Sequence, residues 1–103
     1  MNIEERVQIA ILTKYYGKML TDRQQDILNM YVDNNLSLAE VSSELGISRQ
    51  AVKDALDNAM QTLKNMEEKL QFISRDSNIK QQIEENQNIN LTTKIQLIAL
   101  LED

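Results

Sequence analysis

The sequence predicts an all-α protein built around a helix-turn-helix unit without a wing. Its 103 residues include no proline and only two glycines, so few positions interrupt a helix. Apolar residues recur three and four positions apart along most of the chain, which is the spacing of one helix face. Between residues 37 and 57, a glycine separates two segments that each begin with a helix-capping residue. This combination is typical of a helix-turn-helix.

The first helix is expected from residue 3 to about residue 19. Asn2 and Glu5 can cap its start. Gly17 lies inside the pattern and can end the helix early or allow a close contact. The face predicted to be buried consists of Ile3, Val7, Ala10, Ile11, Tyr15 and Met19.

A second helix is expected from Thr21 to about Val32. Thr21 and Gln24 form a T-x-x-Q capping box at its start. Residues 33–35 are Asp, Asn and Asn, a composition that favours a turn. The buried side of this helix is predicted to be Ile27, Leu28, Tyr31 and Val32.

The helix-turn-helix itself is predicted from capping and turn signals. Ser37 and Glu40 form a second capping box at the start of its first helix. Gly46 stands where the end of a helix needs a left-handed residue. Ser48 can cap the second helix, whose inner face is expected to be Val52, Ala55 and Leu56.

The outward side of the second helix carries the candidate nucleic-acid-binding residues. Arg49 and Gln50 lie near its start, where such side chains reach base edges in the major groove of DNA. Ser48 and Lys53 are predicted to contact the phosphate backbone. Double-stranded RNA is a poorer target, because its major groove is too narrow for a helix.

The charge of the chain favours a second interpretation. The net charge is −5, and the outward positions of the second helix also include Asp54 and Asp57. DNA-binding proteins usually present a basic face, because neutralising phosphates supplies much of their affinity. A protein-interaction adaptor that retains the fold without binding DNA is therefore the alternative function.

The helix that begins at Ser48 is expected to continue to residue 73. Its apolar residues are spaced 4, 3, 4, 3, 4 and 3, which is a heptad pattern: Val52, Leu56, Ala59, Leu63, Met66, Leu70 and Ile73. Such a stripe can be covered within the chain or by another subunit, and both remain open. A homo-oligomer formed through this long helix and the C-terminal helix is predicted.

A C-terminal extension is expected beyond the long helix. Residues 74–78 are polar and predict a break, followed by a short helix at 79–86 and a second break at 86–90. A last helix at 92–102 is apolar nearly all round, so we expect it to be buried. The predicted domains are residues 1–73, the helix-turn-helix domain, and residues 74–103, a helical extension that packs on the same core or on a partner subunit.

Composition argues against catalysis and against cofactors. The chain has no cysteine and no histidine, which excludes disulfides and ordinary zinc sites. No nucleophile motif or glycine-rich phosphate loop is present. We therefore expect no enzyme activity, no catalytic residue, no metal and no cofactor. No apolar run approaches the about 20 residues that span a bilayer, so membrane insertion is not expected and the cytoplasm is the predicted location.

Three motifs resemble the YlxM-like family of small bacterial helix-turn-helix proteins. They are Met19 to Gln24, similar to L-L-T-x-K/R-Q; Ser37 to Val41, similar to S-L-x-E-I/V; and Ser48 to Asp54, similar to S-R-Q-A-V-x-D. The resemblance covers residues 1 to about 73. It departs at Lys53, where the family usually has Tyr. It implies a fold similar to the promoter-reading C-terminal region of bacterial sigma factors, and a regulatory protein that binds nucleic acid or components of the signal recognition particle.

Overall fold

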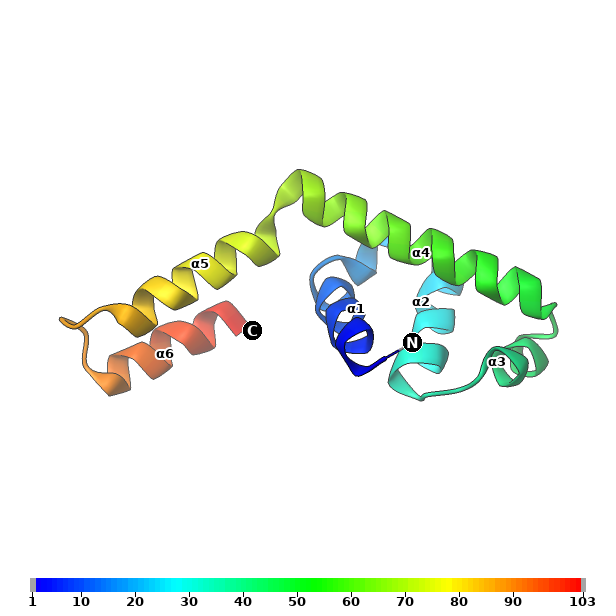
Figure 1. Ribbon diagram of the computed structural model, residues 1–103, viewed down its shortest axis with the longest axis horizontal. Coiled ribbons are helices and arrows are strands. Elements are labelled where there is room, and N and C mark those ends of the chain that lie inside the picture. The colour runs from blue at the N-terminus through cyan, green and yellow to red at the C-terminus, as the bar shows by residue number, and fades with distance from the viewer. Residues whose placement is uncertain (1, 103) are drawn as a thin grey trace. The chain divides into compact units, whose positions relative to one another are not determined.

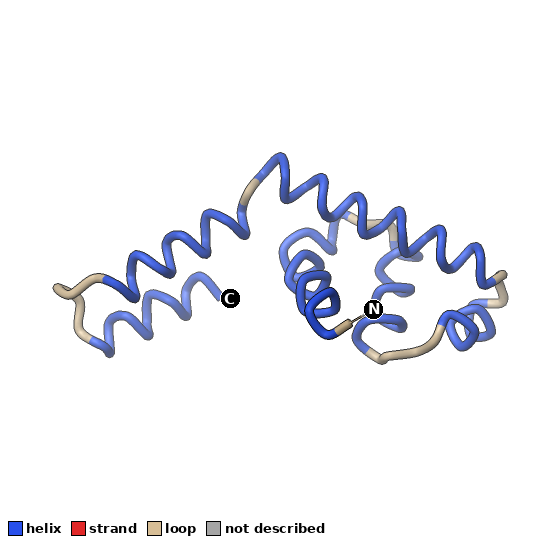
Figure 2. Tube along the Cα trace, viewed as in Figure 1, coloured by secondary structure: helices blue, strands red, loops and turns tan. Residues whose placement is uncertain are grey.

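The computed structural model describes residues 2–102, which form helices joined by short connections and contain no strand (Figures 1 and 2). The predicted all-α helix-turn-helix class is confirmed. The chain divides into two compact units, Met1–Leu70 and Gln71–Asp103. The first unit contains α1 (Ile3–Tyr16), η1 (Gly17–Met19), α2 (Asp22–Leu28), η2 (Asn29–Asp33), α3 (Leu38–Leu45) and α4 (Arg49–Leu70). The second contains α5 (Phe72–Glu85) and α6 (Leu91–Glu102).

Helix α1 buries a different face from the one predicted. The side chains of Ile9, Leu12 and Tyr16 are buried, at 4%, 5% and 1% exposure. Ile3, Val7 and Ile11 instead lie exposed. The cause is that α1 has apolar residues on both sides, so two stripes compete and periodicity alone cannot choose between them. The α-helix ends before Gly17, where a short 3-10 turn follows.

The second predicted helix is present but changes its winding. Thr21 and Gln24 form the predicted capping box, with both reciprocal hydrogen bonds. The α-helix ends at Leu28, and a π-helical turn covers residues 29–33. Arg6 of α1 stabilises the end of this turn, because its guanidinium donates to the Val32 carbonyl at 3.0 Å and to Asn35 Oδ1 at 2.6 Å. These bonds fix the segment that leads into α3.

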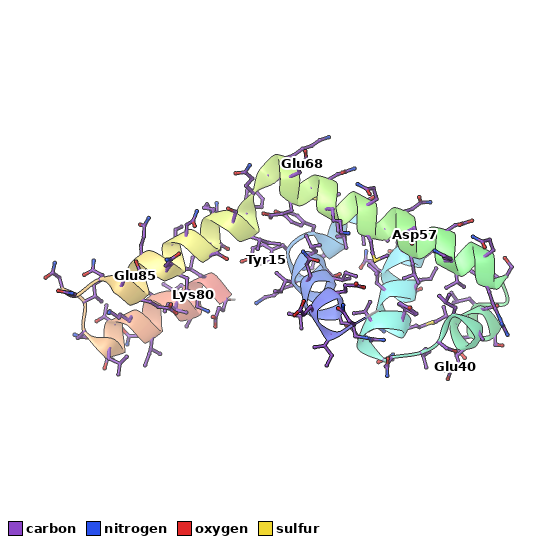
Figure 3. All side chains as sticks on the ribbon, in the orientation of Figure 1. Tyr15, Glu40, Asp57, Glu68, Lys80 and Glu85 are labelled. Carbon is purple, nitrogen blue, oxygen red and sulfur yellow. The ribbon has the colours of Figure 1, made fainter. Side chains whose placement is uncertain are left out.

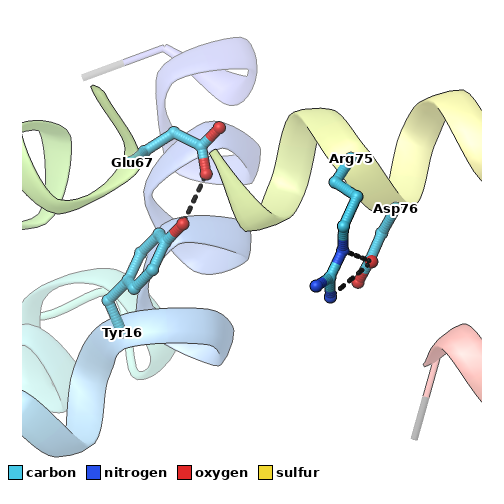
Figure 4. A network of polar contacts seen from close by, with 4 residues as sticks. All are labelled: Tyr16, Glu67, Arg75 and Asp76. Carbon is cyan, nitrogen blue, oxygen red and sulfur yellow. Dashed lines mark hydrogen bonds and ion pairs between the residues drawn. The ribbon is translucent and has the colours of Figure 1, made fainter. Parts of the chain in front are cut away.

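Helix α4 forms the centre of the first unit. It packs against α1, α2 and α3, as Figure 1 shows. The first four positions of its heptad stripe are buried, at 3% exposure or less: Val52, Leu56, Ala59 and Leu63. This part of the stripe is therefore covered within the chain. Near the other end, the Tyr16 hydroxyl donates to Glu67 Oε1 at 2.6 Å and ties α1 to α4 (Figure 4).

The long helix stops at Leu70, not at residue 73 as predicted. Gln71 adopts a left-handed conformation, with φ of 54°. A left-handed residue ends an α-helix, and α5 begins immediately after it. Leu70 is 42% exposed, so the packing that supports the first four heptad positions is weaker here.

The second unit is a helical hairpin in which α5 and α6 lie side by side (Figure 1). The break predicted at residues 74–78 is wrong, because α5 runs through it. Four partly buried residues of α5 are spaced 3, 4 and 3 apart, namely Ile73, Asp76, Lys80 and Ile83. Packing of this face against α6 outweighs the weak helix propensity of the polar residues. The break at 86–90 and the last helix are confirmed.

Candidate nucleic-acid interface

The corner between α3 and α4 is built by local backbone chemistry. The Ser37 hydroxyl accepts from Glu40 N at 3.1 Å, and Glu40 Oε1 accepts from Ser37 N at 3.1 Å. Gly46 ends α3 with φ of 67° and ψ of 33°. This is the left-handed region, which glycine adopts without the Cβ penalty of other residues. The predicted capping box and glycine turn are both confirmed.

Two further hydrogen bonds hold the turn. The hydroxyl of Ser42 donates to the carbonyl of Ile47, which crosses the corner from α3. The hydroxyl of Ser48 accepts from Ala51 N at 3.0 Å and caps α4 as predicted. The orientation of the first turn of α4 is therefore set by bonds on both sides of Gly46.

All four predicted binding residues lie exposed at the start of α4: Ser48, Arg49, Gln50 and Lys53. Two of them are engaged by carboxylates one turn further along. Gln50 Nε2 donates to Asp54 Oδ1 at 2.8 Å, and Lys53 Nζ lies 3.2 Å from Asp57 Oδ2. The Arg49 guanidinium makes no hydrogen bond or ion pair with any other described residue. Among the three longer candidates, Arg49, Gln50 and Lys53, only the Arg49 guanidinium has no polar contact with a neighbouring side chain.

The surface next to the corner is acidic. Helix α3 carries Glu40 and Glu44 and no basic residue, and both carboxylates border a shallow groove that includes Leu36, Ala39 and Ser43. Figure 3 shows Glu40 on α3 and Asp57 on α4. Residues 38–57 thus hold two cations against four carboxylates. In a helix-turn-helix complex the first helix crosses the DNA backbone, so these carboxylates oppose phosphate contacts.

The intrahelical partners of Gln50 and Lys53 were not predicted from the sequence. The signal was present, because Asp54 and Asp57 each lie four residues further on, at the spacing that brings helix side chains together. Arg6 was also missed as a residue that fixes the approach to α3. Its carbonyl acceptors belong to a π-helical turn that no sequence motif indicated.

Comparison with known families shows which family the chain belongs to. A family model described as "UPF0122: Putative helix-turn-helix protein, YlxM / p13 like" matches residues 3–101. The chain belongs to this family. The match extends well past residue 73, so it includes both helices of the second unit and not only the helix-turn-helix. The family description concerns a helix-turn-helix protein and names no enzymatic activity.

Curated relatives share the family name. A UPF0122 protein of Desulforamulus reducens is 44% identical over 73 residues, which are 71% of this chain and 62% of that protein. One from Caldanaerobacter subterraneus is 42% identical over 76 residues, or 74% of this chain and 65% of the relative. One from Clostridium perfringens is 35% identical over 98 residues, covering 90% and 88%. The first two matches thus span less than two thirds of the relatives' length.

No helix within residues 2–102 has the length and apolar content needed to cross a membrane. In the same range, no three His, Cys, Asp or Glu side chains gather in a way that could hold a metal ion.

Proposed function

We propose that this protein is a cytoplasmic DNA-binding regulator that places the start of α4 in the major groove. The observation that carries the proposal is the exposed Arg49 in the first turn of α4, a turn that contains no acidic residue. Arg49 and Gln50 are assigned to base edges, and Ser48 and Lys53 to phosphates. An arginine at this position matches the bidentate contact that guanine offers in the major groove.

The carboxylates beside these residues predict modest affinity. Lys53 must exchange Asp57 for a phosphate, and Gln50 must leave Asp54 before it can reach a base. A lysine that is already paired gains less from a phosphate than an unpaired lysine does. We therefore expect weak nonspecific binding and a shallower dependence on salt than the number of basic residues suggests.

Fluorescence anisotropy of a labelled DNA duplex at low salt tests the proposal. Arg49→Ala should weaken binding about tenfold or more, in line with the loss of one bidentate base contact. Lys64→Ala is the matched control, because it removes the same charge from an exposed position of α4 far from the corner. Equal affinities for the two variants would reject the assigned surface.

A substitution that removes a negative charge beside Lys53 tests the same surface by strengthening binding. Asp57→Asn frees Lys53 and should strengthen DNA binding, with the slope of log affinity against log salt steeper by up to about one. Asp33→Asn removes the same charge from an exposed position in η2. If both variants gain equally, only net charge matters and the α4 surface has no special role. An RNA duplex of the same sequence should compete poorly.

A protein-interaction adaptor is the second candidate function. The acidic surface of α3 and α4 favours it, because four carboxylates suit a basic protein partner better than a phosphate backbone. Resemblance to the YlxM-like family makes protein components of the signal recognition particle the partners to test. Wild-type protein that gives no salt-sensitive anisotropy change with any duplex, yet binds such a component, would support the adaptor.

A further inference from the structure

The second unit exposes an unusual amount of apolar surface for its size. No residue of α5 or α6 is fully buried. On α6, the side chains of Leu91, Ile95 and Leu100 are 73%, 61% and 72% exposed. Leu97, Ile98 and Leu101 are partly buried and share the helical spacing of the side that packs on α5. Helix α6 is therefore apolar both toward α5 and away from it.

The charges of α6 are already used inside the hairpin. Its charged residues are Lys94 and Glu102. Lys94 Nζ donates to the carbonyl of Glu84 at 2.8 Å, and Glu102 Oε1 lies 2.9 Å from Lys80 Nζ. The Glu102 side chain is 56% exposed but is paired with Lys80, so the exposed side of α6 carries no unpaired carboxylate that would repel an identical surface.

We propose that α6 associates with α6 of a second copy of this chain, so that two hairpins form a four-helix arrangement. A symmetric contact places each patch against itself, which is unfavourable for a charged patch and favourable for an uncharged apolar one. Homodimer interfaces are more apolar than other protein interfaces and are depleted in charge. The second unit, residues 71–103, is also short. Chains of fewer than about 40 residues usually need a disulfide, a metal or a partner subunit to fold.

This contact differs from an oligomer formed through the long helix. Val52 and Leu63 of α4 are fully buried within their own unit, so the first part of that stripe is not available to another subunit. The proposed dimer uses α6 and does not depend on whether α4 binds DNA.

Light scattering of the full chain across a wide range of concentrations tests the proposal. The wild-type protein should have twice the mass of the monomer. Ile95→Glu should halve that mass, because it buries a charge against its own copy. Gln82→Glu is the matched control, since it adds the same charge at a polar, exposed position of α5, outside the proposed α6 contact. This control should remain a dimer, and circular dichroism should show unchanged helix content for both variants.

The absence of cysteine allows a second measurement that does not depend on disrupting the interface. Ala99 is exposed on α6, and Ala99→Cys should form a disulfide only between copies, because the chain has no other thiol. Lys64→Cys on α4 should form far less crosslinked dimer under the same oxidation. A wild-type monomer at every concentration would overturn the proposal. So would a dimer that survives Ile95→Glu or that crosslinks equally at both positions.

Discussion

Replacing Gly46 tests the geometry of the corner, because its backbone conformation predicts strain for another residue whereas the space around it predicts no steric clash. Its φ of 67° lies in the left-handed region, where an L side chain is strained. A Cβ added at this position would meet nothing within 4 Å. Replacing Gly46 with alanine should therefore cost backbone strain alone, with no steric contribution.

The expected size of the effect follows from two opposing terms. Holding an alanine in the left-handed conformation costs about 1–2 kcal/mol. Removing a glycine also reduces the freedom of the unfolded chain, which returns about 0.4–1 kcal/mol. We expect Gly46→Ala to lower the free energy of unfolding by about 1 kcal/mol. Gly46→Asn should cost less, because asparagine tolerates this conformation better.

Urea denaturation followed by circular dichroism measures this difference. Ser43→Ala, at an exposed position of α3, is the control and should change stability by less than about 0.5 kcal/mol. A loss above about 3 kcal/mol for Gly46→Ala would show that the corner is crowded. A clear gain in stability would show that residue 46 is not left-handed in solution, and the described geometry of the helix-turn-helix would then be wrong.

Three further outcomes are expected. Leu63→Ala should destabilise the protein by about 2–5 kcal/mol, because Leu63 is fully buried, whereas Leu70→Ala at a 42% exposed position should cost clearly less in the same urea titration. Tyr16→Phe should lower the free energy of unfolding by about 1–3 kcal/mol, because it removes the donor to the Glu67 carboxylate. Glu67→Gln keeps an acceptor and should lower it by less, so equal losses for the two variants would contradict the assigned hydrogen bond. The hydrogen bond and charge of Glu102 raise the pKa of Lys80 above its ordinary value of 10.5. While Glu102 is ionised, the contribution of Lys80 to hairpin stability is fully present below pH 10.5, and it disappears as pH rises through the higher folded-state pKa. In Lys80→Met the alkaline loss of helix content should be smaller.

Local signals in the sequence predicted the corner well. The two capping boxes, the left-handed Gly46 and the cap at Ser48 each depend on residues within a few positions of one another. Such interactions depend on neighbouring residues in the sequence and little on packing between distant segments. The exposure of Arg49 and Gln50 follows from the same local geometry, whereas binding by these residues stays a prediction.

The features that the sequence did not predict depend on packing between distant segments. The buried side of α1 is chosen by packing on α4 and η2, which leaves Leu12 and Tyr16 buried and Val7 exposed. The end of α4 at Gln71 has no glycine or proline to announce it. Conversely, the polar residues 74–78 remain helical because α5 has α6 beside it. Periodicity identified the helices but could not identify their neighbours.

The left-handed Gln71 has a consequence for how the chain can be divided. Every side chain buried at 6% exposure or less in the described residues precedes it, from Ile9 to Leu63. A chain that stops after Leu70 would keep that entire interior. We therefore expect the helix-turn-helix unit to fold without α5 and α6.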